Sequence, residues 1–263
     1  MDRRTFIAGS AALASTTAVE AASAAPKSGT REMYELRTLT FASRDKLQRY
    51  AGFLAEAWFP AMQRLGYGPV GGFVQTDKPD NLTIYLISTY SSSADWLQAE
   101  ARLYADEQFR KAGAAVIDLT ADDPPFTHSE ASVLAAFASW PHIKAPKQTA
   151  GNLARVFELR TYESHSRKAN LKKIEMFDKG ETAIFDRCGF QPVFFGETLA
   201  GPQTPNLTYM VTYPSVEARD GFWKAFSADP EKARLFAIPE YADRLVVSKI
   251  HSTFLTPLPG SLL

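Results

Sequence analysis

The chain has 263 residues with 29 basic and 29 acidic side chains, and 45% of its residues are hydrophobic. The balanced charge argues against a nucleic-acid partner, which usually meets a basic excess, and the composition is that of a globular protein rather than a disordered one. The single cysteine, Cys188, excludes an internal disulfide and a cluster of thiolate metal ligands.

The first 25 residues predict an export signal of the twin-arginine type. Arg3-Arg4-Thr5-Phe6 opens the stretch, a weakly apolar segment rich in alanine follows, and Ala22-Ser23-Ala24 offers the small residues that a signal peptidase reads. We therefore expect residues 1–25 to be removed and the mature chain to reside in the periplasm. No apolar run approaches the ~18 residues of a membrane span, so no transmembrane segment is expected in the mature chain.

Residues 32–138 predict six elements in the order β-α-β-β-α-β. Ser43 is a helix N-cap, apolar side chains follow it at helical spacing, Pro60 bends that helix and Gly66 ends it. A turn of Asp77-Lys78-Pro79-Asp80 joins two strands. The expected strands are 33–40, 69–76, 82–90 and 131–138, with a second helix near 92–111.

The same pattern returns later in the chain, which indicates a tandem duplication. Tyr34-Glu35-Leu36-Arg37-Thr38 recurs as Phe157-Glu158-Leu159-Arg160-Thr161, 123 positions later, and residues 34–70 share ten identities with residues 157–193 over 37 positions without a gap. The second unit is predicted at 154–256, after a linker at 139–153 and before a C-terminal tail at 257–263. Its later elements are expected at 192–200, 206–213, 215–227 and 245–254.

The order β-α-β-β-α-β is the split βαβ pattern of ferredoxin-like domains, which places the chain in the α+β class. One such unit covers one face of its sheet with helices and leaves the other face open. Two units bury both open faces when sheet packs against sheet. We therefore predict two ferredoxin-like βαββαβ units that form an intramolecular, pseudo-dimeric α+β barrel with its helices outside.

With these motifs in place, the sequence resembles two tandem units of the NIPSNAP family, within the dimeric α+β barrel superfamily. The resemblance rests on the Glu-Leu-Arg openings at 35–37 and 158–160, on the helix that ends at Gly66 or Gly189, and on the Pro-Val strand behind it. It covers nearly all of residues 32–256. The resemblance implies the barrel architecture and a binding or scaffolding role, and it implies no particular reaction.

Alternation along the strands gives the candidate binding residues. Phe157, Leu159 and Thr161 share one strand face, while Glu158, Arg160 and Tyr162 share the other. If the apolar face meets the helices, the polar face lines the barrel interior, and Glu35 and Arg37 do the same in the first unit. The arginines could hold an anionic or enolic ligand, or a glutamate could act as a general base. The alternative is an internal charge network that compensates itself.

The histidines show no metal-ligand spacing, so neither a metal site nor a bound cofactor is assigned. His128 and His142 are expected in solvated loops. His251, on the last strand, is predicted to face the barrel interior, where it could be a haem ligand, an acid/base group or a hydrogen-bonded strand residue.

These observations predict an exported barrel protein that binds a small, partly apolar molecule in its interior and forms a homo-oligomer. A cofactor-free monooxygenase or an isomerase on the same scaffold is the enzymatic alternative. The third interpretation is a protein-interaction module whose barrel is packed with apolar side chains.

Overall fold

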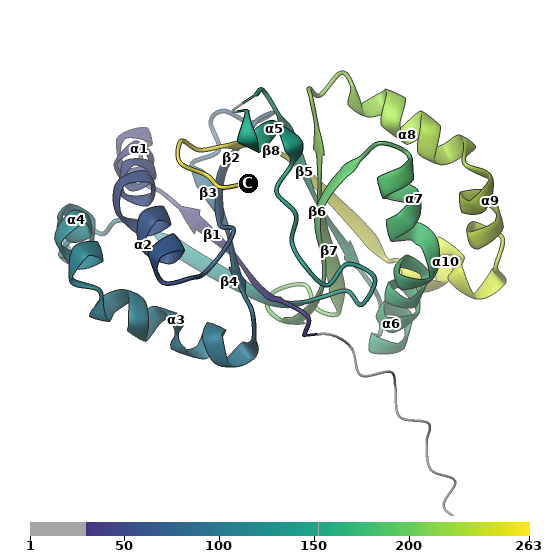
Figure 1. Ribbon diagram of the computed structural model, residues 1–263, viewed down its shortest axis with the longest axis horizontal. Coiled ribbons are helices and arrows are strands. Elements are labelled where there is room, and N and C mark those ends of the chain that lie inside the picture. Colours follow the sequence, from purple (N-terminus) through teal and green to yellow (C-terminus); the bar gives the residue numbers. More distant parts are fainter. Residues whose placement is uncertain (1–29, 152) are drawn as a thin grey trace, which may run out of the picture.

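In the computed structural model, which describes residues 30–151 and 153–263, eight antiparallel strands close into a barrel with helices outside it (Figure 1). The predicted export signal lies outside the described residues. The strands follow the order β1-β3-β2-β8-β5-β7-β6-β4 around the barrel. Their bounds are β1 Met33–Thr40, β2 Gly71–Gln75, β3 Thr83–Tyr90, β4 His128–Ala136, β5 Val156–Glu163, β6 Gln191–Ala200, β7 Asn206–Tyr213 and β8 Lys249–Pro257.

Each half of the chain contributes four neighbouring strands to this barrel. The first half has the order β4-β1-β3-β2 and the second has β8-β5-β7-β6, so the two halves share one ferredoxin-like topology. The pairs β2–β8 and β4–β6 join the halves and leave no open sheet edge. The predicted intramolecular α+β barrel is confirmed.

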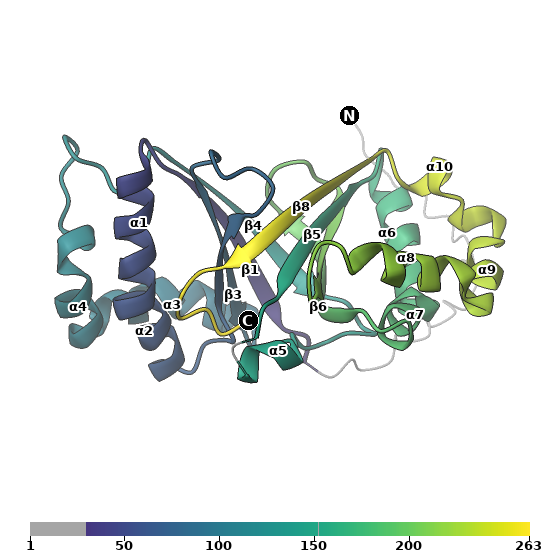
Figure 2. The same cartoon turned by 90° about the horizontal axis from the view of Figure 1, so that it is seen from above.

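Two groups of helices cover opposite sides of the barrel, one from each half (Figures 1 and 2). The first group comprises α1 Arg44–Phe53, the π-helical turn η1 Leu54–Trp58, α2 Phe59–Arg64, α3 Ser93–Ala105 and α4 Glu107–Ile117. The second comprises α6 Arg167–Met176, the π-helical turn η2 Phe177–Glu181, α7 Thr182–Arg187, α8 Arg219–Ala228 and α9 Pro230–Phe236, followed by η3 Pro239–Tyr241 and α10 Asp243–Val246. The short helix α5, Lys147–Ala150, lies between the halves.

The first long helical segment of each half is interrupted by a π-helical turn. Ser43 caps α1 as predicted, because its hydroxyl accepts a hydrogen bond from the Lys46 amide. The turn η1 precedes Pro60, which lacks the N–H that a continuous α-helix would need. The turn η2 occupies the same place in the second half without a proline. Pro60 is therefore not the only cause of this irregularity, and the bend belongs to both halves.

The single second helix predicted for each half is in fact a pair of helices. The chain leaves the helix at Asp106, between α3 and α4, and at Asp229, between α8 and α9. Both aspartates have extended backbone angles and accept backbone N–H groups of the helix that follows. An aspartate that caps the following helix also ends the preceding one. The spacing of apolar residues does not reveal such a break.

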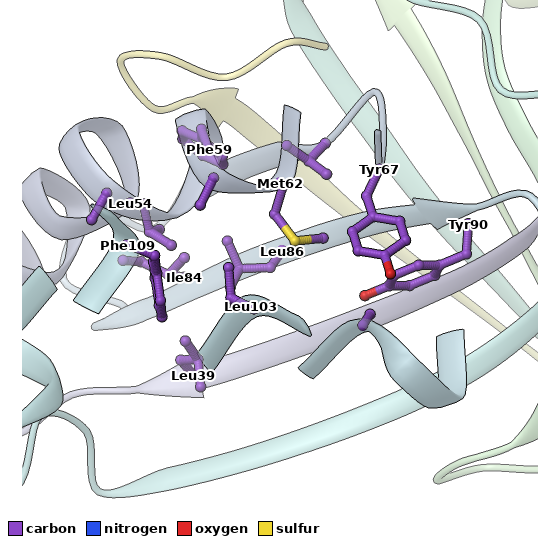
Figure 3. Close-up of a cluster of buried hydrophobic side chains, with 14 of the residues drawn as sticks. Leu39, Leu54, Phe59, Met62, Tyr67, Ile84, Leu86, Tyr90, Leu103 and Phe109 are labelled. Carbon is purple, nitrogen blue, oxygen red and sulfur yellow. The ribbon is translucent and has the colours of Figure 1, made fainter. Parts of the chain in front are cut away.

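Three apolar clusters hold these layers together. One lies between the first-half strands and α1–α4, where Met62 approaches Leu86 and Leu103 (Figure 3). A second, rich in aromatic rings, lies between the second-half strands and their helices. The third combines side chains of both halves, including Tyr34, Phe157 and Leu159. Because it draws on strands all around the sheet, this third cluster lies inside the barrel.

The predicted linker and tail both pack against the barrel. Trp140 and Ile143 of the linker are buried, and the side chain of Leu263 belongs to the interior cluster. The Leu262 amide donates to the carbonyl of Val70 at 3.0 Å, so the tail of the second half is attached to the first half. None of the described helices is long and apolar enough to span a bilayer.

Candidate functional site

The predicted site residues of β1 and β5 point away from the barrel interior, contrary to the prediction. Glu35 accepts a hydrogen bond from the indole N–H of Trp96 on α3, and Glu158 accepts from Arg219 on α8. The side chains that share this face, Arg37, Arg160 and Tyr162, therefore lie between the sheet and the helices. The interior positions belong to their apolar neighbours, such as Leu36 and Leu159.

The physical reason is that a closed barrel buries both faces of its sheet. Water does not reach most of the interior, so unpaired charges there would be costly, and apolar side chains occupy much of it. The helices, in contrast, offer polar partners such as Trp96 and Arg219 to the charged pairs. The assumption that the apolar strand face must meet the helices was therefore wrong for both halves.

The first half contains a cavity of about 370 Å³ between its strands and its helices. Strands β1, β3 and β4 form one side, and α1, η1, α2, α3 and α4 form the other. Leu97 and Tyr104 of α3 line the cavity although both are largely exposed, so they lie at its opening. The cavity is thus open to small molecules from solvent.

Arg37 and Glu35 form an ion pair on the strand side of this cavity. Nε of Arg37 donates to Glu35 at 2.8 Å, and Trp96 donates to the other carboxylate oxygen at 2.8 Å. The Arg37 side chain is 41% exposed, against 12% for Glu35. Burial alone would lower the pKa of Arg37, but the charge of Glu35, the hydrogen bond to it and further nearby groups together raise that pKa. Arg37 therefore remains a cation whose fork keeps N–H groups available to a ligand.

Aromatic side chains make up much of the helix side. Tyr50 and Phe53 of α1 contribute rings whose centroids lie 5.2 Å apart, and Trp58 of η1 and Phe109 of α4 add further apolar surface. Burial raises the pKa of Tyr50 to about 12, although the nearby Arg37 charge lowers it. The Tyr50 hydroxyl is therefore protonated at neutral pH and can donate a hydrogen bond.

Buried side chains occupy the corresponding place in the second half. The positions 123 residues after Tyr50, Trp58 and Leu86 hold Lys173, Glu181 and Tyr209, and all three are buried. Nζ of Lys173 lies 3.3 Å from the Glu181 carboxylate. The two halves share a topology, but they differ in what fills the space between sheet and helices.

Glu158 is the centre of a closed hydrogen-bond network in this second half. Its carboxylate has no solvent exposure and accepts from Arg160, Arg219, Tyr213 and Ser252 at 2.5–3.0 Å. Burial alone would raise the pKa of Glu158, but the hydrogen bonds from Arg219, Ser252 and Tyr213 and the Arg160 charge lower it to about 2. This geometry favours the self-compensating network for this pair.

Arg160 and Tyr162 extend the network away from Glu158. The guanidinium of Arg160 donates to the Tyr162 hydroxyl at 3.2 Å and lies 4.9 Å from the centre of the Trp223 ring. The Tyr162 hydroxyl is also 2.9 Å from that of Tyr209. Arg160 is 11% exposed, which leaves little room for a ligand beside it.

His251 lies apart from the other predicted site residues. It lines a separate cavity of about 230 Å³, together with residues such as Leu36, Thr161 and Thr208, and one ring nitrogen contacts the Glu163 carboxylate. A porphyrin does not fit beside it, because even the pockets that bind smaller, drug-sized ligands have volumes of about 300–1,000 Å³. The structure therefore distributes the six predicted residues over three places: the open cavity, the closed network and this second cavity.

The sequence alone did not single out the aromatic residues of the open cavity. Tyr50, Trp58, Trp96 and Phe109 lie on helices, where packing is the ordinary explanation of an aromatic residue. Comparison of the halves contained a signal, because Trp96 stands 123 positions before Arg219 and both contact the strand glutamate of their own half. The residue that contacts the strand glutamate is thus Trp96 in the first half and Arg219 in the second. This change from a neutral to a charged side chain indicates that the space between sheet and helices differs between the halves.

One family profile matches the chain. The NIPSNAP profile matches residues 157–262, which cover the four strands of the second half except for Val156, the first residue of β5. No curated protein sequence matches the chain.

Several solved structures share the fold at low sequence identity. A putative monooxygenase from Lactobacillus acidophilus NCFM is 14% identical, with a TM-score of 0.55 and coverage of 86% of this chain and 94% of that one. A putative monooxygenase from Fusobacterium nucleatum subsp. nucleatum is 10% identical, with a TM-score of 0.58 and coverage of 87% and 93%. An anthrone oxidase-like protein is 12% identical, with a TM-score of 0.50 and coverage of 89% and 95%. At these identities the similarity establishes the fold.

Proposed function

We propose that the cavity between sheet and helices in the first half binds a small, planar, partly apolar molecule that carries an anionic or enolic oxygen. The observation that supports this proposal is one open space with a half-exposed guanidinium on one side and aromatic rings on the other. The proposed site thus includes Glu35 and Arg37. It lies between sheet and helices, and not in the barrel interior where the sequence led us to expect the ligand. Glu158, Arg160 and Tyr162 serve the stability of the second half.

The size and chemistry of the cavity suit such a ligand. Its volume of about 370 Å³ lies at the lower end of the range for small-molecule sites. Burial of a planar ring system against Tyr50, Phe53 and Trp58 contributes about 25 cal/mol per Å² of apolar surface. A charge-assisted hydrogen bond from Arg37 adds orientation, because its donors lie in one plane. Tyr50 can donate a second hydrogen bond to the same oxygen.

Arg37 supplies the cationic side of the proposed site, so its replacement should weaken the binding of an anion. In the Arg37→Met variant we expect the affinity for 1-anilinonaphthalene-8-sulfonate, an aromatic anion, to fall at least about tenfold, because a charge-assisted hydrogen bond contributes about 1.5–3 kcal/mol. Fluorescence titration measures this affinity. Arg49→Met is the matched control, since Arg49 lies on α1 with an exposed ion pair to Asp123. Equal affinities of the two variants would contradict the proposed site.

An enzymatic version of this proposal is a cofactor-free monooxygenase in the same cavity, favoured by the similarity to two putative monooxygenases and an anthrone oxidase-like protein. Dioxygen would convert a CH₂ group next to an activated carbonyl into a second carbonyl, and the remaining oxygen atom would leave as water. Arg37 and Tyr50 would stabilise the enolate that forms first. Dioxygen uptake with anthrone as the probe, absent in Arg37→Met, distinguishes the enzyme from a binding protein.

We also propose that the chain is exported to the periplasm by the twin-arginine route, on the strength of its first 25 residues. Replacement of both Arg3 and Arg4 by lysine is expected to retain the protein in the cytoplasm, because this route recognises the paired arginines. Cell fractionation with immunoblotting measures the distribution. Lys27→Arg is the control, since it exchanges the same two residue types outside the motif. Undiminished periplasmic delivery of the double variant would refute the proposal.

We infer further that the two halves arose by tandem duplication of a NIPSNAP-like unit, with the unit boundaries at 32–138 and 154–256. Equivalent interactions 123 positions apart support this inference. Ser43 and Ser166 cap the first helix of their own half. The ion pair Arg64–Asp106 of the first half corresponds to Arg187–Asp229 of the second. The homo-oligomer expected from the sequence stays a prediction, which light scattering of the purified chain can test.

A further inference from the structure

The second cavity, of about 230 Å³, lies at one mouth of the barrel, where strands of both halves meet. Its walls carry an unusual number of hydroxyl groups, from Thr38 on β1, Ser132 on β4, Thr161 on β5, Thr208 on β7 and Thr253 on β8. We propose that this mouth binds a small, neutral, polyhydroxylated molecule such as a monosaccharide or a polyol. This site shares no residue with the cavity of the first half and stands independently of the function proposed there.

The hydroxyl groups have hydrogen-bonding capacity left for a ligand. The hydroxyls of Thr161 and Thr208 lie 2.9 Å apart across β5 and β7, so each spends one interaction on the other. A hydroxyl has one donor and two acceptor positions, and both threonines therefore retain acceptor capacity. Asn206 also lines the cavity, and its orientation is fixed because it accepts from the hydroxyls of Thr198 and Thr208 and donates to the carbonyl of Pro202. A row of oriented hydroxyls matches a ligand with several hydroxyls of its own.

His251 is held in place at this mouth by Glu163. One of its ring nitrogens, Nε2, contacts the Glu163 carboxylate, which fixes the plane of the ring. The Tyr85 ring and the side chains of Leu36 and Leu159 form the apolar part of the lining. Polar edges combined with a limited apolar surface suit a sugar or polyol, whose C–H groups need contacts as well.

The charges around the mouth disfavour ionic ligands. Among the described residues, no lysine or arginine lines this cavity, so an anion such as phosphate would lack a permanent cationic partner. Glu130, the lining carboxylate, is exposed at the rim, and the described chain contains no cluster of three or more potential metal ligands. The lining therefore suits a neutral ligand better than an anion or a metal ion.

The loop between β6 and β7 overhangs this mouth in a conformation that its sequence does not favour. Pro202 and Gln203 line the cavity, and Gln203 has a φ of 60°, in the left-handed region that favours glycine. Such backbone conformations are enriched at ligand-binding sites, where the gain in binding offsets the local strain. Gln203 is exposed, so its packing contributes little to stability. Its amide is placed where a ligand hydroxyl could reach it.

Titration calorimetry and saturation-transfer NMR with D-glucose, D-xylose, myo-inositol and glycerol test the proposal. We expect at least one of these probes to bind with a dissociation constant of about 1 mM or lower, equivalent to about −4 kcal/mol, and inorganic phosphate not to bind at this site. The double variant Thr161→Val/Thr208→Val is expected to lose at least tenfold in affinity. Thr76→Val/Thr256→Val is the matched control, because those hydroxyls form a similar cross-strand pair at 2.8 Å outside the cavity.

The variant Gln203→Gly keeps the test decisive if the double variant does not fold. It relieves the left-handed backbone position and deletes the amide, so we expect unchanged or higher stability together with weaker binding. Arg37→Met should bind the polyhydroxylated probe normally, which separates this site from the proposed function. Absence of binding by all four probes, or equal affinity in the pocket and control variants, would overturn the proposal, as would binding of phosphate in their place.

Discussion

Glu158→Gln is expected to lower the free energy of unfolding by about 3–5 kcal/mol, because it removes the charge that compensates a buried arginine. Arg160 is 11% exposed and its ion pair to Glu158 spans 2.5 Å, so the guanidinium cannot recover its hydration in the folded state. The change keeps the shape of the side chain and leaves a hydrogen-bonding amide. Urea denaturation followed by circular dichroism measures the loss.

Glu35→Gln is the matched control for this variant, since Glu35 stands 123 positions earlier and pairs with Arg37 in the same way. Arg37 is 41% exposed and can be hydrated when its partner loses its charge. We therefore expect a clearly smaller loss than for Glu158→Gln. Similar losses for the two variants would show that the second-half pair is not the more stabilising of the two.

The same network gives the protein a defined sensitivity to acid. The folded state lowers the pKa of Glu158 to about 2 from an ordinary value of 4.5, so the carboxylate contributes stability that is fully present above pH 4.5. That contribution, about 3 kcal/mol, is lost as the pH falls from 4.5 towards 2. The stability difference between the wild type and Glu158→Gln should therefore narrow over this interval. If the free energies of unfolding of the two proteins differed by the same amount at every pH, the proposed stabilisation of the Glu158 carboxylate by this network would be contradicted.

Local signals in the sequence were sufficient to predict the fold. Ser43 begins the first helical segment by capping it with a hydrogen bond, and Gly66 ends it with a left-handed φ of 79°. Both effects involve only residues that are close in the sequence. The repeat at an offset of 123 then implied that two equal units must bury two open sheet faces. What local signals did not predict was the division of the second helix at Asp106, because a cap inside a helical pattern looks like one more surface aspartate.

The candidate site was harder to predict because it depends on which sheet face turns inward. Alternation correctly grouped Glu35 with Arg37, but it could not decide between the two faces when both are buried. The residues of the open cavity were a further difficulty, since Tyr50 and Trp58 have the same apolar spacing as core residues. Only their replacement by Lys173 and Glu181 in the second half distinguishes them, and that contrast gains its meaning from the structure.

Lys173 and Glu181 form a second buried ion pair whose removal should have a large effect. Lys173 is surrounded by the rings of Tyr162, Phe177 and Phe236, with its Nζ 5.1–5.7 Å from their centres. Burial lowers the pKa of Lys173, but the charges of Glu181 and Asp243 outweigh burial and raise it, so the lysine stays charged. Burial raises the pKa of Glu181, and the Lys173 charge opposes that rise.

Lys173→Met is therefore expected to lower the free energy of unfolding by about 3–5 kcal/mol at neutral pH, since it leaves Glu181 buried without a partner. The deficit should shrink as the pH falls towards the ordinary glutamate pKa of 4.5 and should be absent below it, because a carboxyl with a raised folded pKa takes up its proton in the folded state above pH 4.5. Lys172→Met, next to it on α6, is the control: Lys172 is partly exposed and pairs with Glu175 and Glu240 near the surface, so its loss should cost at most about 1 kcal/mol.

The double variant Lys173→Met/Glu181→Met separates the effect of the pair from that of a stranded charge. Apolar residues of similar volume often replace a buried ion pair without loss of stability, and the surrounding aromatic rings offer an apolar environment for two methionines. We expect the double variant to recover most of the stability lost in Lys173→Met, as measured by urea denaturation. If it is as unstable as the single variant, the pair itself stabilises the fold, and the loss cannot be attributed to an uncompensated Glu181.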